Sequence, residues 1–545
     1  MAAAARTPPA FPTDLEVSRP ETVEIPITSE MPSTAAPRKV GNVVLDIRDL
    51  KTYFYTYDGV VKALDGVSFK VRSGETLGLV GETGCGKSVT AFSTTRLIAD
   101  PPGRVMSGTI LFRGANLLWG LDKEARFKPQ KKTNRVKVSR KFHRIKAAQE
   151  RMNAVRGAGI SMIFQEPTAA LNPIFSISNQ LGEAILLHRG DEIYEGLLRA
   201  DPEAAAHTKA AVEELLNVAV KNDPVDLRKA SAALSEQARL PTIATQVFHT
   251  LRHVTLDPST KLPEIQKALQ RTRLSGLRRR FLEHLASRYA VDQELKAISF
   301  SEMRNGRLEK NKRRAVGRRL TSLKLRGLFY RLPGIKGYVN KPLKEEVFWK
   351  TVQLLEGVTI ANPVQVARGF PHELSGGMLQ RVMIAMALSS DPEVLIADEP
   401  TTALDVTIQA QILQLMKDLK QRVGTAILLI THDLAVIAEV SDRVCVMYAG
   451  QIVETAAVKD LFSRPLHPYS QGLLSSIPRL DRPDKRLESI PGSVPNLIFP
   501  PPGCRFHPRC PYAMPICKEA RPPTTVEGPG RTVACYLYKG PVAVE

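Results

Sequence analysis

Residues 81–88 have the sequence GETGCGKS, whose residue types and spacing fit a loop that binds phosphate groups. Glycines leave backbone N–H groups free to surround phosphate oxygens, and a helix that starts directly after the loop favours their negative charge. In such a loop Lys87 would reach the β and γ phosphates of ATP, and Ser88 would bind Mg²⁺. The predicted ATP contacts are Gly81, Glu82, Thr83, Gly84, Cys85, Gly86, Lys87, Ser88 and Val89.

Two adjacent acidic residues stand at the end of the apolar run VLIAD: Asp398 is its last residue, and Glu399 follows directly. Asp398 can hold Mg²⁺ through water, and Glu399 is a candidate general base for the attack of water on ATP. An acidic pair at the end of a buried strand can also be purely structural. Its position downstream of a phosphate-binding loop favours the catalytic interpretation.

The sequence LSGGMLQ, at residues 374–380, opens a predicted helix shortly before the acidic pair. Two glycines and a serine at a helix start form a second anion site. With this motif the chain resembles the ATP-binding cassette (ABC) ATPases, whose signature motif has the same residues in the same place. The resemblance implies that the γ phosphate of ATP bound to a partner subunit is contacted by Ser375, Gly376, Gly377 and Gln380.

Three further short motifs occur in the order that the ABC family requires. Gln165 in MIFQEP resembles the Q-loop, Asp405 in ALD the D-loop, and His432 in ITHD the switch histidine. The resemblance implies that Gln165 and His432 sense the γ phosphate and act with Glu399 in catalysis. A lone histidine after an apolar strand is more often an ordinary core residue, so its role depends on the family pattern. The ligands implied for Mg²⁺ are Ser88, Gln165 and Asp398.

The aromatic residue that stacks on adenine in ABC ATPases corresponds to Phe54, with the neighbouring Tyr53 and Tyr55 as alternatives. Aromatic residues in an exposed strand are usually only strand formers, and this alternative stays open.

Four of the six cysteines lie in the last forty-two residues, at Cys504, Cys510, Cys517 and Cys535. Their spacing, C-x5-C-x6-C-x17-C, is too wide for a zinc knuckle built from C-x2-4-C pairs. In a reducing cytosol a cluster of thiols still indicates a metal, and the family resemblance favours a [4Fe–4S] cluster. Zinc and unligated thiols are the alternatives.

These residues need a framework of strands and helices to position them. The apolar run 76–80 before the phosphate-binding loop and the helix-compatible run after it predict strand, loop and helix in that order. Further apolar runs at 394–398 and 426–431 alternate with helical patterns, which is typical of a mostly parallel sheet covered by helices. Alternating runs on either side of a DG turn, near residue 58, predict a hairpin. The fold class is therefore α/β: an ABC-type P-loop domain with an antiparallel β subdomain and a helical subdomain enlarged by a basic insertion.

Composition along the chain predicts five segments. Residues 1–42, rich in alanine and proline, are expected to be a disordered tail. Residues 43–190 form the first part of the cassette and contain a basic insertion at about 121–156. Residues 191–345 are a helical, basic insertion, and 346–478 are the second part of the cassette. Residues 479–545 form a C-terminal extension that carries the four cysteines.

The net charge of +21 belongs to two stretches and not to the body of the chain. Residues 121–156 carry +10 and residues 271–345 carry +15, so the remainder is slightly acidic. No nucleic-acid contact is therefore expected of the body. We hypothesise that the basic stretches face anionic lipid or acidic loops of membrane subunits, although a solvated helical face is an equally good interpretation.

The segments around the motifs resemble the branch of ABC ATPases that serves dipeptide and oligopeptide importers, including HPYSQGLL and the ending PPPGCRFHPRCPYAMPIC. The resemblance implies an ATP-hydrolysing subunit that forms a heterodimer with a second ABC ATPase. Two transmembrane permeases and an extracytoplasmic solute-binding protein would complete the importer. No apolar run reaches the roughly 20 residues that cross a bilayer, so a peripheral place on the cytoplasmic face of the membrane is expected.

The resemblance leaves the solute open, because the branch also includes importers of nickel and some oligosaccharides. The alternative function is a non-transport ABC ATPase that acts on nucleic acid. A second cassette or a long heptad coil would favour that alternative, and the sequence has neither.

Overall fold

The computed structural model describes most of the chain, and the predicted N-terminal tail lies outside it except for Gly41 and Asn42. The described residues are 41–129, 136–200, 209–220, 224–238, 242–252, 261–269, 274, 276–402, 404–476, 490–538 and 542.

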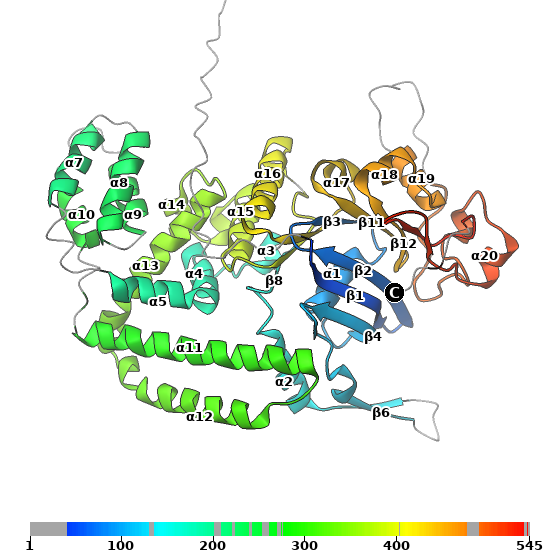
Figure 1. The fold of residues 1–545 in the computed structure, drawn as a ribbon, viewed down its shortest axis with the longest axis horizontal. Helices are drawn as coiled ribbons and strands as arrows, with labels where there is room; N and C mark the ends of the chain where they lie inside the picture. Colours follow the sequence, from blue (N-terminus) through cyan, green and yellow to red (C-terminus); the bar gives the residue numbers. More distant parts are fainter. Residues whose placement is uncertain are drawn as a thin grey trace, which may run out of the picture.

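The central sheet has the strand order β13-β14-β12-β11-β3-β10-β9-β8 (Figure 1). Its middle strands, from β11 to β8, are parallel to one another, and the strands from β12 outward are antiparallel. This confirms the predicted mostly parallel sheet. Its strands are β3 (Thr76–Val80), β8 (Ile160–Ile163), β9 (Val394–Asp398), β10 (Ala426–Ile430), β11 (Arg443–Tyr448), β12 (Gln451–Ala457), β13 (Thr525–Val526) and β14 (Thr532–Val533).

A second, antiparallel sheet packs beside the first. The predicted hairpin across the DG turn is confirmed, because β1 and β2 pair antiparallel over their whole length. The strand order is β2-β1-β4-β5. Its strands are β1 (Val43–Tyr55), β2 (Val60–Arg72), β4 (Gly103–Phe112) and β5 (Ala115–Asn116).

The two faces of the central sheet bury different sets of side chains, because successive residues of a strand point to opposite faces. Leu428 and Ile430 join the core shared with the antiparallel sheet, whereas Ile427 and Leu429 join the core shared with the helices. All five residues of β9 and of β10 are buried, which explains why these runs are continuously apolar. The cassette helices are α1 (Lys87–Thr94), α15 (Gly376–Leu388), α16 (Val406–Val423), α17 (Leu434–Val440), α18 (Val458–Ser463), α19 (Pro468–Ser475) and α20 (Pro515–Glu519).

The long segment between the Q-loop and the signature motif consists, in its described part, of helices joined by turns and contains no strand, in agreement with the predicted mainly helical insertion. Its helices continue the hydrophobic core of the cassette: Leu197, Leu215 and Leu282 belong to the same cluster as Leu395 of β9. The predicted boundary at residue 345 falls inside α13. The helices are α3 (Pro167–Ala170), α4 (Ile177–His188), α5 (Gly190–Arg199), α7 (Lys209–Val220), α8 (Pro224–Ala238), α9 (Thr242–Leu251), α10 (Leu262–Leu269), α11 (Gly276–Asn305), α12 (Lys310–Arg326), α13 (Ile335–Gly357) and α14 (Pro363–Arg368).

The two basic stretches, far apart in the sequence, meet in space. The smaller one forms β6 (Ala125–Pro129), β7 (Val136–Arg140) and α2 (Phe142–Met152), and α2 packs against α11 (Figure 1). Arg313 of α12 forms an ion pair with Glu150 of α2, with 3.3 Å between nitrogen and oxygen. Helices α2 and α12 therefore belong to one edge of the molecule.

Candidate active site

The phosphate-binding loop joins the end of β3 to the start of α1, and two of its glycines are required by the backbone. Gly81 has φ +156° and Gly86 has φ +107°. A Cβ atom at Gly81 would lie 2.1 Å from the carbonyl oxygen of Met447, and one at Gly86 would lie 2.7 Å from that of Ala63. No other residue type fits at either position without moving the backbone of a neighbouring segment.

Lys87 is the first residue of α1 and is buried, although its side chain is charged. Its ammonium group donates hydrogen bonds to the carbonyl oxygens of Gly81, at 2.7 Å, and Glu82, at 3.1 Å. A buried cation needs such partners, because desolvation without them is costly. The loop therefore holds the ammonium group against its own backbone, where phosphate oxygens can replace the carbonyls as partners.

Ser88 and Asp398, two of the predicted Mg²⁺ ligands, lie together: the hydroxyl of Ser88 donates to Oδ1 of Asp398 at 3.1 Å. Burial raises the pKa of Asp398 to about 6, and the neighbouring charge of Glu399 adds to this, against the opposing effects of Ser88 and Lys87. Hydroxyl and carboxylate oxygens are the hard ligands that Mg²⁺ prefers, so these residues fit that ion.

Glu399 connects the predicted catalytic residues. Its carboxylate accepts hydrogen bonds from Nε2 of Gln165 at 2.8 Å, from Nδ1 of His432 at 3.1 Å and from the hydroxyl of Thr402 at 3.1 Å. Burial acts to raise its pKa, but the hydrogen bonds from His432 and Thr402, together with the charges of His432 and Lys87, outweigh burial and lower it. Glu399 is therefore an ionised carboxylate at neutral pH, as a general base must be. Since a carboxylate only accepts, Nδ1 of His432 carries the proton in this arrangement.

The parallel register of β9 and β10 explains why Glu399 and His432 meet. Asp398 pairs with Ile430 in the register, and the N–H of Glu399 donates to the carbonyl of Ile430 at 2.8 Å. Glu399 also has φ +48°, in the left-handed region that residues other than glycine rarely adopt. Such strained backbone is concentrated at functional sites, and here it occurs at the proposed base.

Thr402 was missed by the sequence analysis. The only available signal was its position three residues after Glu399 in the run DEPTT.

The signature motif starts α15. Ser375 caps the helix and accepts a hydrogen bond from the N–H of Met378 at 3.4 Å. Gly377 lies near Leu404, which follows the acidic pair Asp398 and Glu399 in sequence. Gln380 is buried, and its amide donates to the carbonyl of Pro400 at 2.8 Å, so it links α15 to the end of β9 within its own chain. Contact of these residues with the nucleotide of a partner stays a prediction.

Asp405 caps α16 and accepts a hydrogen bond from the N–H of Ile408 at 2.8 Å. The predicted adenine-stacking residue, Phe54, lies half-buried in β1, and its ring is 2.7 Å from the position of a Cβ at Gly103. Tyr53 bonds Asp65 through its hydroxyl at 3.3 Å, while Tyr55 is 47% exposed. Tyr55 is thus the most accessible of the three, and the assignment among them stays a prediction.

The four C-terminal cysteines line one small cavity of about 10 Å³, room for about one water molecule. All four are free thiols. Burial, together with the other three sulfur atoms, raises the pKa of Cys535 to about 11. In the described part of the chain, no group of three or more Cys, His, Asp or Glu side chains has an arrangement that would hold a metal ion. The predicted iron–sulfur or zinc site is therefore not supported by this arrangement of the thiols.

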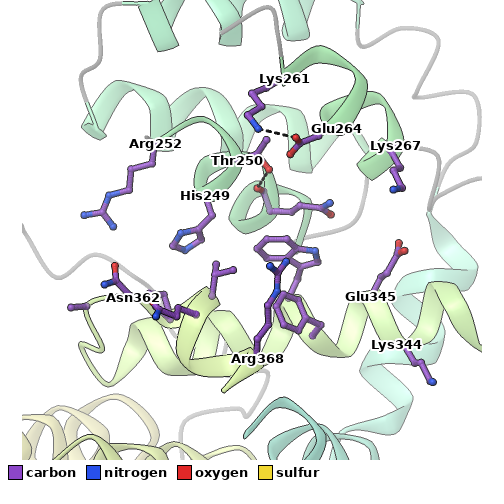
Figure 2. Close-up of a pocket in the computed structure, with 17 residues that line it drawn as sticks. His249, Thr250, Arg252, Lys261, Glu264, Lys267, Lys344, Glu345, Asn362 and Arg368 are labelled. Carbon is purple, nitrogen blue, oxygen red and sulfur yellow. Dashed lines mark hydrogen bonds and ion pairs between the residues drawn. The ribbon is translucent and has the colours of Figure 1, made fainter. Parts of the chain in front are cut away.

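A separate hollow of about 940 Å³ lies between α9 and α10 on one side and α13 and α14 on the other (Figure 2). Basic side chains surround it, among them Arg252, Lys267, Lys344 and Arg368. It contains none of the nucleotide motifs, so it is distinct from the ATP site. Among the helices that the structure describes, none has the length and apolar content to span a membrane.

The phosphate-binding loop, the acidic pair and the glutamine and histidine around Glu399 define the class of the protein: it is a P-loop ATPase of the ABC type. Comparison with known families agrees. Residues 64–402 match the family model described as ABC transporter, and residues 453–517 match the one described as oligopeptide/dipeptide transporter, C-terminal region. The chain belongs to the ABC transporter family, in the branch that carries this C-terminal region.

Relatives in Bacillus subtilis match over most of their length. The oligopeptide transport ATP-binding protein AppD is 32% identical over 91% of this chain and 98% of its own. The dipeptide transport ATP-binding protein DppD is 32% identical over 91% of this chain and 94% of its own. A solved dimeric bacterial ABC transporter cassette is 14% identical and covers 76% of this chain and 98% of its own, with a TM-score of 0.35. The family matches and the relatives from Bacillus subtilis support the ATPase subunit of an ABC importer and do not support the alternative that acts on nucleic acid.

Proposed function

We propose that this ABC ATPase energises the uptake of dipeptides or oligopeptides. The names of its relatives and the match of residues 453–517 support this solute class. The main structural support for the ATPase function is the set of hydrogen bonds around Glu399, next to Ser88 and Asp398. By its family, the chain works in a heterodimer with a second ABC ATPase, below two permeases and an extracytoplasmic solute-binding protein, at the cytoplasmic face of the membrane.

The proposed mechanism assigns a task to each residue of the site. The carboxylate of Glu399 accepts a proton from the attacking water, while Gln165 and His432 orient that carboxylate. Lys87 leaves its backbone partners and binds phosphate oxygens, which concentrates positive charge where negative charge develops. Ser88 and Asp398, with Gln165, would hold Mg²⁺, which neutralises phosphate charge when bound.

The test is ATP hydrolysis by the chain co-expressed with the subunits encoded beside it, in membranes, for the wild type and Glu399→Gln. We expect hydrolysis that needs the permeases, disappears in the variant and is indifferent to added duplex DNA. Uptake into vesicles that contain the solute-binding protein then compares a dipeptide, an oligopeptide, Ni²⁺ and an oligosaccharide. Stimulation by DNA without any membrane subunit would overturn the transport function, and uptake of Ni²⁺ alone would overturn the peptide assignment.

For the four cysteines we propose a metal site, with [4Fe–4S] as the first candidate and zinc as the second. The proposal rests on the family resemblance and on the fact that Cys504, Cys510, Cys517 and Cys535 line one cavity. The sulfur atoms do not form a metal-binding group in this arrangement, so they would have to move to bind one. The test is the iron, acid-labile sulfide and zinc content of anaerobically purified wild type and Cys510→Ser. If the wild type contains neither iron nor zinc at a stoichiometric level, the proposal is wrong.

For the edge of the molecule that contains α2 and α12, called the basic edge below, we propose contact with anionic lipid. Helix α12 has eight Lys or Arg residues and no Asp or Glu. At its C-terminal end and in the turn that follows, Leu325, Leu328, Phe329 and Leu332 are each at least 50% exposed. Basic residues beside exposed apolar ones suit a membrane surface, with about 1 kcal/mol for each cation near anionic lipid.

The test of the basic edge is flotation of the full chain with vesicles of phosphatidylglycerol or of phosphatidylcholine. We expect binding to the anionic vesicles only, weakened by salt and by the triple change Arg314→Gln, Arg318→Gln and Lys324→Gln. Equal binding of the triple variant and the wild type would indicate that α12 is an ordinary solvated helix.

A further inference from the structure

Two side chains of the C-terminal region, Tyr469 and Arg509, contact Glu82 of the phosphate-binding loop, one at its backbone and the other at its carboxylate. The hydroxyl oxygen of Tyr469 accepts a hydrogen bond from the N–H of Glu82 at 2.9 Å. The guanidinium group of Arg509 donates to both carboxylate oxygens of Glu82, at 2.7 and 3.0 Å. Neither Tyr469 nor Arg509 belongs to a motif that binds or hydrolyses ATP.

The side chains of Tyr469 and Arg509 are fixed by further contacts within the C-terminal part of the chain. Tyr469 is fully buried, and its ring lies 4.6 Å from that of Tyr448 and 5.4 Å from that of Phe506, measured between centroids. Arg509 is 8% exposed and also donates to the carbonyl of Pro491 at 2.8 Å. A guanidinium group that is held in this way through its Nε presents its two terminal nitrogens to a carboxylate in a fixed orientation.

The turn before Tyr469 is fixed in the same way. His467 caps α19, and its Nδ1 accepts a hydrogen bond from the N–H of Tyr469 at 3.0 Å. Complete burial lowers the pKa of His467 to about 3, so the ring is neutral and its Nδ1 can accept. The sequence His-Pro-Tyr at 467–469 thereby places the tyrosine hydroxyl against the loop.

Glu82 has two properties that make this contact matter for ATP. Its carbonyl oxygen is one of the two that hold the ammonium group of Lys87, so a shift of Glu82 shifts the lysine that must reach the phosphates. Its carboxylate is a negative charge in a loop that binds a triphosphate, and an uncompensated charge of the same sign would weaken binding. Arg509 compensates that charge with a bidentate ion pair.

We propose that Tyr469 and Arg509 are positioning residues for ATP binding: they hold Glu82 and neutralise its charge, and through it they set the conformation of the phosphate-binding loop. The C-terminal region then contributes to the nucleotide site through its contacts with Glu82. The proposal concerns the ATPase activity and does not depend on which solute is transported.

The test measures the dissociation constant of a fluorescent ATP analogue on the isolated full chain, and KM and kcat for ATP in the assembled transporter. We expect Arg509→Ala to raise both Kd and KM about tenfold, with kcat changed less than twofold. Tyr469→Phe, which keeps the ring and removes the acceptor, should raise them about threefold. Arg509→Lys should recover only part of the loss, because an ammonium group cannot make the bidentate contact.

Two controls separate positioning from a general loss of structure. Arg521→Ala removes another arginine of the C-terminal extension (479–545), one that bonds the carbonyl oxygens of Asp65 and Gly66, and it should leave Kd unchanged. In the background of Glu82→Gln, Arg509→Ala should cost less than half of its effect in the wild type, because the charge to be neutralised is gone. An equal cost in both backgrounds, or a lower melting temperature of Arg509→Ala with unchanged Kd and KM, would overturn the proposal.

Discussion

Two adjacent acidic residues at the end of β9 are given opposite properties by their surroundings. Asp398 is 1% exposed, and burial raises its pKa to about 6. Glu399 is only partly buried and receives hydrogen bonds from His432, Thr402 and Gln165, and its pKa is lowered. Desolvation therefore favours a proton on Asp398 until a cation replaces it, while hydrogen bonding keeps Glu399 ready to accept a proton.

The raised pKa of Asp398 predicts a stability that depends on pH. The pKa of Asp398 in the folded chain lies above the value of 3.8 expected in the unfolded chain. The contribution of Asp398 to the free energy of unfolding is therefore fully present below pH 3.8 and is lost as the pH rises through about 6. The shift corresponds to a cost on the order of 3 kcal/mol at pH 8. In the absence of nucleotide and Mg²⁺, Asp398→Asn should therefore raise the melting temperature at pH 8 and not at pH 4, while abolishing Mg²⁺-dependent hydrolysis. A variant that is no more stable than the wild type at pH 8 would contradict the buried-charge explanation.

Thr402 offers a second test at the level of single residues. Its hydroxyl donates to Glu399 and helps to lower the pKa of that carboxylate. Thr402→Ala removes the donor, so the pKa of Glu399 rises toward its usual range and the acidic limb of the pH–rate profile moves to higher pH. We expect kcat to fall by about threefold in the acidic part of the profile and to stay unchanged at pH 7. Thr402→Ser keeps the hydroxyl and should keep the wild-type profile. If both variants shift the profile equally, the hydroxyl is not the cause.

Among the elements, the sequence predicted those whose signals are local. The buried strands β3, β9 and β10, the β1–β2 hairpin and α16 lie where apolar runs, turn residues and periodicity placed them. The contact of Gln165 with Glu399 joins residues 234 positions apart, and that of Arg509 with Glu82 joins residues 427 positions apart. Only the family pattern indicated the first, and no pattern indicated the second, because such contacts depend on how the whole chain packs.

Helix α11 shows the same limit for the insertion, which composition predicts as helical but cannot place. Its first half packs in the helical core, where Tyr289 donates to the carbonyl of His188 at 2.8 Å. Its last turns enter the core of the two sheets: Met303 is 3% exposed there, and Phe300 packs edge-on against Phe112 at 6.1 Å. The insertion therefore joins both cores of the cassette.

This placement predicts that the insertion and the cassette unfold together. Met303→Ala removes a buried side chain from the sheet core and should cost about 2 to 4 kcal/mol, lowering the denaturation midpoint of the main transition. Leu325→Ala, at a position that is 68% exposed, is the matched control and should change stability by less than about 0.5 kcal/mol. The denaturation transition is measured by tryptophan fluorescence and by circular dichroism. If Met303→Ala has the same transition as the wild type, α11 is only loosely attached to the sheet core.

At the scale of the whole molecule, each chain of the proposed heterodimer would offer its signature motif to the nucleotide of the other. Ser375 and the glycines after it open α15, and Gln380 is used inside its own chain to hold Pro400. Ser375→Arg should therefore leave the Kd for ATP of the isolated chain unchanged and reduce hydrolysis by the assembled heterodimer more than tenfold, because the bulky cation would obstruct the anion site offered to the partner's nucleotide. Lys87→Ala is the contrasting variant, since it should lose binding and hydrolysis together. Measurements of Kd on the isolated chain and of turnover in the complex distinguish the two, and a Ser375→Arg chain that binds ATP as weakly as Lys87→Ala would show that the signature motif acts on its own nucleotide.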